Sequence, residues 1–326
     1  MTLRWSIRVN NDAPGTSYPV LARCVEAAGF DQLWVSHDLF WRSALVLIPS
    51  MLAQTQRIAI GIGIANPYTI HPAELAMVAA TLDELSNGRF RLGLGAGAAE
   101  FLQWVGIPQE KPLATVRRAV TQIRRVLAGE PVPGWDAAAC LRFPARPVPI
   151  YLGGFGPRML QLAGELADGA LPLLLPPERY ADVAATVAEG AARAGRSLDD
   201  LDLAACVWCS VAEDRKAAEA ALREKFAYYG PAFDAATLAR VGLTPEDLLP
   251  AQHALVAGDR ERALRLVPSA VLDLALVGRP PELIPRLEQL VALGARHLSF
   301  GPPLGPDPVA AVTLLGRTVL PHFAQH

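Results

Sequence analysis

Polar and ionisable side chains follow several of the apolar runs in this sequence, at the points where those runs end. The apolar run 32–36 (QLWVS) is followed at once by His37 and Asp38, an imidazole and a carboxylate, which are side-chain types that transfer protons in enzymes. Two interpretations fit this pair. The side chains form an acid/base or hydrogen-bonded pair, or Asp38 caps the strand end by accepting hydrogen bonds from nearby backbone amides. Both interpretations stay open.

A glycine-rich turn follows another apolar run, residues 148–154. The segment 153–159 reads GGFGPRM, and the apolar periodicity of residues 157–169 predicts a helix that starts at Pro157. Glycine lets the backbone approach a ligand closely, and the first turn of a helix offers unpaired N–H groups and a positive dipole end. The segment therefore predicts an anion site, most simply for a phosphate, although a tight turn that only needs glycine would look the same.

Two further junctions carry polar residues. The run 57–65 leads into Asn66, Tyr68 and His71, and we interpret His71 as a cap or packing residue because it precedes a helix that begins with proline. The run 90–97 leads into GAGAAE, which places Glu100 beside the same edge as a third candidate for proton transfer. No spacing of His, Cys and Glu indicates a metal site.

The order of elements predicts a (β/α)8 TIM barrel. Continuous apolar runs are typical of parallel strands that are covered on both faces, and here they alternate with helical patterns. The predicted strands are residues 3–9, 32–36, 57–65, 90–97, 148–154, 169–175, 201–211 and 296–301. The predicted helices are residues 18–30, 72–88, 112–129, 157–169, 177–194, 213–228, 281–293 and 308–323. A doubly wound open sheet is disfavoured, because no GxGxxG follows the first strand.

Two segments interrupt this alternation. Residues 229–280 have helical patches and no clear strand, and they predict a helical insertion between strands seven and eight, within one domain that spans residues 1–326. Residues 129–147 form a proline-rich loop, and we expect it to shape access to the active site, as long loops at strand ends do.

Composition narrows the classes of function. The net charge of −2 and the scattered basic residues give no basic stripe for a nucleic acid, and no apolar stretch reaches membrane-spanning length. The amino-terminal segment lacks the apolar region of a signal peptide, so we expect a cytoplasmic protein. Cys206 and Cys209 lie three apart in an apolar strand and should face opposite sides as small buried residues. Four histidines have no evident partner and are interpreted as surface or core residues: His253, His297, His322 and His326.

Long motifs at these junctions resemble a known group of enzymes. The segment 63–97, GIANPYTIHPAELAMVAATLDELSNGRFRLGLGAG, strongly resembles the bacterial luciferase-like superfamily, and within it the branch that uses the deazaflavin coenzyme F-420. The patterns NPYTxHPA and GPRMLQLAGELADG are similar to those of the methylenetetrahydromethanopterin reductase group. The resemblance runs from about residue 3 to residue 320, with the specific motifs between residues 32 and 170.

The resemblance implies a site. It implies a TIM barrel with an insertion after strand seven, and a non-prolyl cis peptide with a bulge at Gly63–Ile64, behind the coenzyme ring. The coenzyme phosphate should meet the amides of residues 153–159. The cofactor-binding residues that follow from it are Gly63, Ile64, Asn66, Ala96, Gly97, Ala98, Gly153, Gly154, Phe155, Gly156, Pro157, Arg158 and Met159. The candidates for proton transfer are His37, Asp38 and Glu100.

The sequence also departs from the group. Asp followed by His is common at the end of strand two, and here the order is His37 then Asp38, so either side chain is a candidate to face the ring. Ala98 stands where the sugar-phosphate dehydrogenases of the family carry glutamate, which argues against that activity. Ile70 stands where the reductase group has arginine, and Asn10 and Asn11 stand near an expected early acidic residue, so the archaeal substrate is not implied.

The function implied by the resemblance is a coenzyme F-420-dependent oxidoreductase that transfers a hydride between the deazaflavin and a small organic substrate. The alternative within the superfamily is an FMN-dependent monooxygenase. A non-catalytic member that has lost its cofactor is a third hypothesis, and the glycine-rich anion site disfavours it. Many relatives are dimers, so a homodimer is expected.

Overall fold

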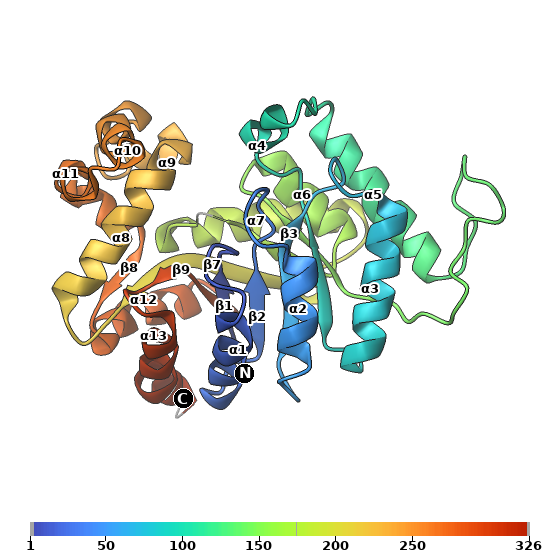
Figure 1. The fold of residues 1–326 in the computed structure, drawn as a ribbon, viewed down its shortest axis with the longest axis horizontal. Helices are drawn as coiled ribbons and strands as arrows, with labels where there is room; N and C mark the ends of the chain where they lie inside the picture. The colour runs from blue at the N-terminus through green and yellow to red at the C-terminus, as the bar shows by residue number, and fades with distance from the viewer. Residues whose placement is uncertain (1–2, 174, 325–326) are drawn as a thin grey trace.

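A computed structural model describes residues 3–173 and 175–324 of the chain. Eight parallel strands form a closed barrel, in which each strand pairs with the next and the last returns to the first (Figure 1). The barrel strands are β1 (Arg4–Val9), β2 (Gln32–Val35), β3 (Ala59–Ala65), β4 (Phe90–Leu94), β5 (Ile150–Gly153), β6 (Gly169–Leu171), β7 (Asp202–Val211) and β9 (His297–Leu304). The predicted TIM barrel is confirmed.

The alternation of residues along β3 shows how the sequence builds this barrel. Ile60 and Ile62 are fully buried in the layer between strands and helices. Gly61 and Gly63 face the barrel axis, where a Cβ atom on Gly61 would lie 2.4 Å from the Trp34 ring. Glycine at these positions therefore leaves room inside the barrel for one large aromatic side chain.

Helices surround the strands. They are α1 (Ser17–Ala27), α2 (Ala44–Leu52), α3 (Pro72–Ser86), α5 (Pro112–Leu127), α6 (Pro157–Leu166), α7 (Tyr180–Arg193), α12 (Pro280–Ala292), α13 (Pro308–Leu314) and α14 (Leu320–Ala324). In α5 the buried residues Val116, Val120 and Ile123 recur at helical spacing, as the sequence predicts. The sequence did not predict α2, because its residues ALVLIPSML are apolar on every side and include Pro49.

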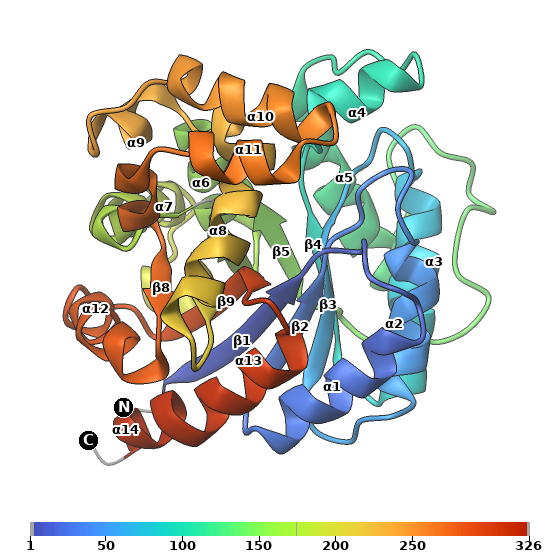
Figure 2. The ribbon, with the colours of Figure 1, turned by 60° about the vertical axis from the view of Figure 1, so that its left-hand side comes forward.

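A cluster of helices lies between β7 and β9. It consists of α8 (Arg215–Tyr229), α9 (Ala235–Ala239), α10 (Leu249–Val256) and α11 (Arg260–Leu266), and it has its own core around Trp208 and Phe226. Figure 2 shows α9–α11 at the end of the barrel opposite the two chain termini. The expectation of no strand in residues 229–280 was wrong, because β8 (Leu276–Gly278) pairs with Cys209–Val211 of β7. Three residues are too few to give a recognisable pattern.

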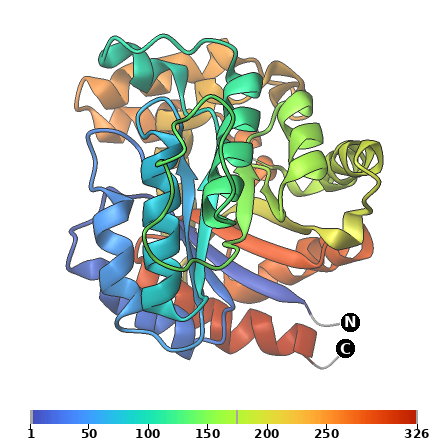
Figure 3. The ribbon, with the colours of Figure 1, turned by 90° about the vertical axis from the view of Figure 1, so that its right-hand side faces the viewer.

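The loop of residues 129–147 does not shape the cavity described below. It connects the end of α5 to the start of β5, and it runs along the outside of α3 and α5 (Figure 3). Trp135 from this loop stacks on the ring of His71. None of the loop residues lines the cavity, so the expectation that it controls access was wrong. Although Trp135 reaches His71 at the start of α3, the loop stays on the outer side of the helices and does not line the cavity.

The amino-terminal ends of the strands meet around one largely buried carboxylate. Asp202 accepts hydrogen bonds from His297 Nδ1 at 2.9 Å and from Tyr151 Oη at 2.6 Å, and it forms an ion pair with Arg4 at 2.6 Å. Although burial opposes ionisation, His297 and Arg4 hold the pKa of Asp202 far below its usual range. His297 is a core residue as expected, but it has partners, which the sequence did not reveal. His322 also has one, Glu288, and His326 lies outside the described residues.

Two smaller expectations concern the interior and the surface. Cys206 packs inside the barrel while Cys209 packs in the outer layer, which confirms that they face opposite sides. In the described part of the chain, no helix combines the length and the apolar character needed to cross a bilayer.

Candidate active site

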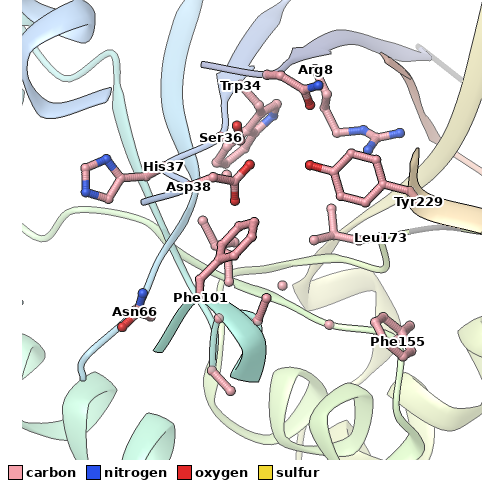
Figure 4. A pocket seen from close by; sticks show the side chains of 18 of the residues that line it. Arg8, Trp34, Ser36, His37, Asp38, Asn66, Phe101, Phe155, Leu173 and Tyr229 are labelled. Atoms are coloured by element: carbon pink, nitrogen blue, oxygen red, sulfur yellow. The ribbon is translucent and has the colours of Figure 1, made fainter. Parts of the chain in front are cut away.

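A cavity of about 530 Å³ opens at the carboxyl ends of the strands. Figure 4 shows side chains that point into it from opposite walls. The strands and the segments after them contribute Arg8, Val9, Asn10, Trp34, Ser36, His37, Asp38, Leu39, Gly63, Ile64, Asn66, Ala96, Gly97, Ala98, Ala99, Phe101, Leu102, Gly153, Gly154, Phe155, Gly156, Met159, Leu173, Trp208 and Pro302, and α8 contributes Lys225 and Tyr229. Most of the sequence-predicted site residues are therefore brought together.

The end of β3 forms one wall. The Gly63–Ile64 peptide is cis, and the register between β3 and β4 shifts between Ile62 and Ala65, so the predicted cis peptide and bulge are confirmed. The Ile64 side chain fits against glycines of β4 and β5. A Cβ atom on Gly95 or Gly153 would lie 2.1 Å or 2.5 Å from Ile64 atoms. The glycines therefore let Ile64 fill the space that neighbouring side chains would occupy, and the cavity wall here is apolar.

Asn66 fixes the exit from β3. Its Oδ1 accepts hydrogen bonds from the backbone N–H groups of Tyr68, at 3.2 Å, and Thr69, at 3.0 Å. Gly97 has φ +74° and lies against the Asn66 side chain, so a residue with a Cβ atom would be strained there. His71 caps α3 by accepting a hydrogen bond from Ala73 N–H, which confirms its predicted role.

The glycine-rich turn before α6 offers fewer amides than the sequence suggests. The N–H of Gly154 donates to Leu171 O, and the N–H of Met159 donates to Gly156 O. Within the described residues, the backbone N–H groups of Phe155, Gly156 and Arg158 have no partner. These three donors lie at the start of a helix, where an anion is favoured.

Asp38 and His37 diverge in the structure. The Asp38 carboxylate points into the cavity toward the wall that carries Tyr229, whereas the His37 ring points away from Tyr229 (Figure 4). His37 Nδ1 accepts a hydrogen bond from Ala44 N–H at the start of α2, and burial lowers its pKa. Burial raises the pKa of Asp38, against the effects of Ser36, Lys225 and His37. Of the two, Asp38 is the group poised to exchange a proton within the cavity.

Asn11 positions the segment that carries Asp38. Its side chain is fully buried, and Nδ2 donates to the backbone carbonyls of Asp38, at 3.0 Å, and Arg42, at 2.7 Å. The hydroxyl of Ser36 donates to Asn11 Oδ1 at 2.9 Å. These bonds hold both ends of the 36–42 segment to the end of β1.

Cationic and aromatic side chains that the sequence did not indicate form another wall of the cavity. Arg8 comes from β1, Trp208 from β7, and Lys225 and Tyr229 from α8. The Lys225 Nζ lies 3.9 Å from the centre of the Tyr229 ring. Arg8 was detectable as a charge inside an apolar strand, but nothing in the pattern of α8 marks its residues.

Three predicted site residues lie outside the cavity. Glu100 is exposed in the first turn of α4 (Ala99–Trp104). Pro157 and Arg158 are exposed in the first turn of α6. Of these two residues, only Arg158 contributes to the anion site proposed below, through its backbone N–H. In the part of the chain that the structure describes, no group of three His, Cys, Asp or Glu side chains has an arrangement suited to a metal ion.

Comparison with known proteins agrees with this geometry. The sequence profile of the luciferase-like monooxygenase family matches residues 9–297. The chain belongs to this family. It is 33% identical to the 5,10-methylenetetrahydromethanopterin reductase of Archaeoglobus fulgidus over 310 residues, which cover 92% of this chain and 93% of that protein.

Two solved structures extend the comparison. The coenzyme F-420-dependent tetrahydromethanopterin reductase of Methanopyrus kandleri superposes with a TM-score of 0.90 at 29% identity, and the match covers 99% of this chain and all of that one. An F-420-dependent secondary alcohol dehydrogenase, described in complex with an F-420–acetone adduct, superposes with a TM-score of 0.76 at 20% identity and covers 98% of each chain. The latter likeness supports the fold alone.

Proposed function

We propose that this chain is a coenzyme F-420-dependent oxidoreductase that transfers a hydride between the deazaflavin and a small organic substrate. The observation that carries the proposal is the shape of one cavity. It has an apolar wall at Ile64, a glycine turn with free amides, and a carboxyl group, Asp38, whose pKa is raised by burial. The similarity to the F-420-dependent reductases of Archaeoglobus and Methanopyrus supports the same assignment.

The residues present fit this cofactor. A planar ring needs an apolar support without projecting side chains, which Ile64 and the neighbouring glycines provide. An anionic tail needs donors that are not already used, and the N–H groups of Phe155, Gly156 and Arg158 have no other partner in the described chain. A Cβ atom at Gly156 would meet nothing within 4 Å, so the turn has open space beside these donors.

The bound deazaflavin would supply the hydride chemistry, and the protein would supply position and protons. Ile64 and the neighbouring glycines would hold the ring against one wall, and the 36–42 segment, held by Asn11, would keep Asp38 facing it. Asp38 would give or accept a proton at its carboxyl oxygen, because burial raises its pKa toward the working range. Phe101, Leu173 and Trp208 would exclude water from the reacting atoms.

Titration of the apo-protein with purified F-420 and, separately, with FMN tests the assignment. We expect F-420 to bind with a micromolar dissociation constant, measured by quenching of its fluorescence, and FMN not to bind at the same concentrations. Binding of FMN without F-420 would replace the proposal with a flavin monooxygenase. Failure of both to bind would favour a member that has lost its cofactor.

The proposal extends to the cellular setting. We propose that the protein is a homodimer in the cytoplasm. Sedimentation velocity at micromolar protein concentration tests the dimer, and fractionation of the producing cells tests the location.

A further inference from the structure

Arg8 is a buried cation without an acidic partner. It is 7% exposed and lies in the wall of the cavity. Its Nε donates to the hydroxyl of Ser299 at 3.1 Å, and its Nη2 donates to the carbonyls of Val207, at 2.8 Å, and Ser299, at 3.4 Å. All of these acceptors are neutral. Within the described residues, no carboxylate oxygen lies within 4 Å of the guanidinium, so its charge is unpaired.

The remaining nitrogen of Arg8 is open to the cavity. Nη1 has no hydrogen bond to the described residues, yet no enclosed side-chain nitrogen or oxygen in the described structure lacks a partner. Nη1 must therefore be reachable from the cavity that Arg8 lines. Its two N–H donors are available to a ligand.

Lys225 brings a second positive charge to the same wall. It lines the cavity and its Nζ lies over the rings of Tyr229, at 3.9 Å, and Trp208, at 5.8 Å. Asp12 and Asp38 are near enough to act on Lys225 electrostatically, but neither lies within 4 Å of it. The two cations repel one another, and a negative charge between them would relieve that repulsion.

This cationic pair is separate from the free amides before α6. The amides follow β5, whereas Arg8 comes from β1 and Lys225 from α8. In Figure 4, Phe155 of the glycine turn lies at the bottom of the view, away from Arg8 at the top, with Leu173 between Phe155 and Tyr229. A cofactor tail that uses the amides would therefore leave the cationic wall to the other reactant.

We propose that Arg8 and Lys225 bind a carboxylate group on the substrate, so that this oxidoreductase acts on a small organic acid. The inference rests on the proposed function, which assigns the anionic tail of the cofactor to the free amides before α6. One guanidinium nitrogen and one ammonium group match the two oxygens of a carboxylate. Asp38, which is near enough to act on Lys225 electrostatically, disfavours a group with two negative charges, such as a phosphate monoester.

Binding measurements on matched acid and amide pairs test the proposal. We would titrate the apo-protein and the F-420-loaded protein by calorimetry with acetate and acetamide, crotonate and crotonamide, and cinnamate and cinnamamide, at pH 6.5. We expect at least one acid to bind ten times more tightly than its amide. The preference should disappear in Arg8→Gln and fall several-fold in Lys225→Met. Arg118→Gln, which removes an exposed positive charge from α5, should leave it unchanged.

Each other outcome contradicts the proposal in a distinguishable way. Equal binding of acid and amide across all three pairs would exclude a carboxylate site, whatever the F-420 titration shows. Tighter binding of phenyl phosphate than of every acid would assign the wall to phosphate. If Arg8→Gln weakens F-420 binding as much as acid binding, Arg8 serves the cofactor. Circular dichroism checks that Arg8→Gln folds, and Arg8→Lys, which keeps the charge, should recover part of the preference.

Discussion

His37 and Ala44 are joined across the end of β2, where His37 Nδ1 accepts a hydrogen bond from the backbone N–H of Ala44 at 3.1 Å. Ala44 is the first residue of α2, so the imidazole does the work of an N-cap for a helix whose adjacent Ser43 makes no side-chain cap. The bond needs Nδ1 to be unprotonated. Together with burial, this keeps the ring neutral at neutral pH and leaves Nε2 as its N–H donor.

The cap predicts different effects for two substitutions of His37. Asparagine can offer a carbonyl oxygen near the position of Nδ1, whereas alanine offers no acceptor. We expect His37→Ala to lose about 1 kcal/mol of unfolding free energy, as lost caps do, and His37→Asn to lose less than half of that. Urea denaturation measures both. We also expect kcat/KM to be higher in His37→Asn than in His37→Ala, and equal loss of activity in the two would show that the ring itself is needed.

Asp38 should dominate proton transfer. Its carboxylate faces the cavity, so Asp38→Asn should lower kcat/KM by about 10²- to 10⁴-fold, the range expected for a lost acid/base group. The affinity for F-420 should change less than threefold. Glu100→Gln is the matched control, since Glu100 is exposed and lies outside the cavity. A larger loss of activity in the Glu100 variant than in the Asp38 variant would reverse the assignment.

Lys225 predicts a stability effect that depends on pH. Burial lowers its pKa to about 7, against the attraction of Asp12 and Asp38, while the unfolded chain keeps the ordinary value of about 10.4. Between these values the unfolded state binds the extra proton, so this group makes the protein more stable as pH rises. Lys225→Met should therefore raise Tm more at pH 6 than at pH 9. The control is Lys216→Met, an exposed lysine of the same helix, and an equal rise at both pH values would contradict the prediction.

Gly156 offers a way to block the anion site without unfolding the protein. Its φ is −73°, which any residue adopts, and a Cβ atom there would meet nothing within 4 Å. Gly156→Leu should lower Tm by no more than about 4 °C, because leucine in place of glycine at the N-cap of α6 costs about 1 kcal/mol. It should weaken F-420 binding at least tenfold. Unchanged cofactor affinity would mean that the coenzyme does not use this turn.

Asp202 should matter for folding and not for chemistry. It lies at the amino-terminal end of the barrel, bonded to His297 and Tyr151, so Asp202→Ala leaves a buried histidine and tyrosine without their acceptor. We expect a loss of about 3 kcal/mol at pH 7. Because the folded pKa lies below the unfolded value, the stabilisation is present above about pH 4 and is lost as pH falls. The exposed Asp199→Asn is the control, and a loss below 1 kcal/mol in the Ala variant would refute the prediction.

The barrel could be predicted because the signals that indicate its strands and helices are local in the sequence. Apolar runs, helix starts and glycine turns lie within a few residues, and the cis peptide at Gly63–Ile64 followed from a family motif. The divergence of His37 and Asp38 could not be predicted, because it depends on Asn11, which is 27 residues before Asp38. Lys225 and Tyr229 could not be predicted as cavity residues from the sequence. Tertiary packing, which includes the contact of Phe226 with Trp208, places α8 beside the cavity.

The two walls of the cavity come from separate lengths of the chain. The glycines and free amides lie between residues 63 and 159, whereas Lys225 and Tyr229 belong to α8, whose Phe226 packs in the core of the helical cluster. Substitutions in residues 215–275 can therefore change which substrate binds, while the glycines and free amides of residues 63–159 are left intact. Evolution or protein engineering can exchange this helical segment of the enzyme to obtain new reactions with the same reductant.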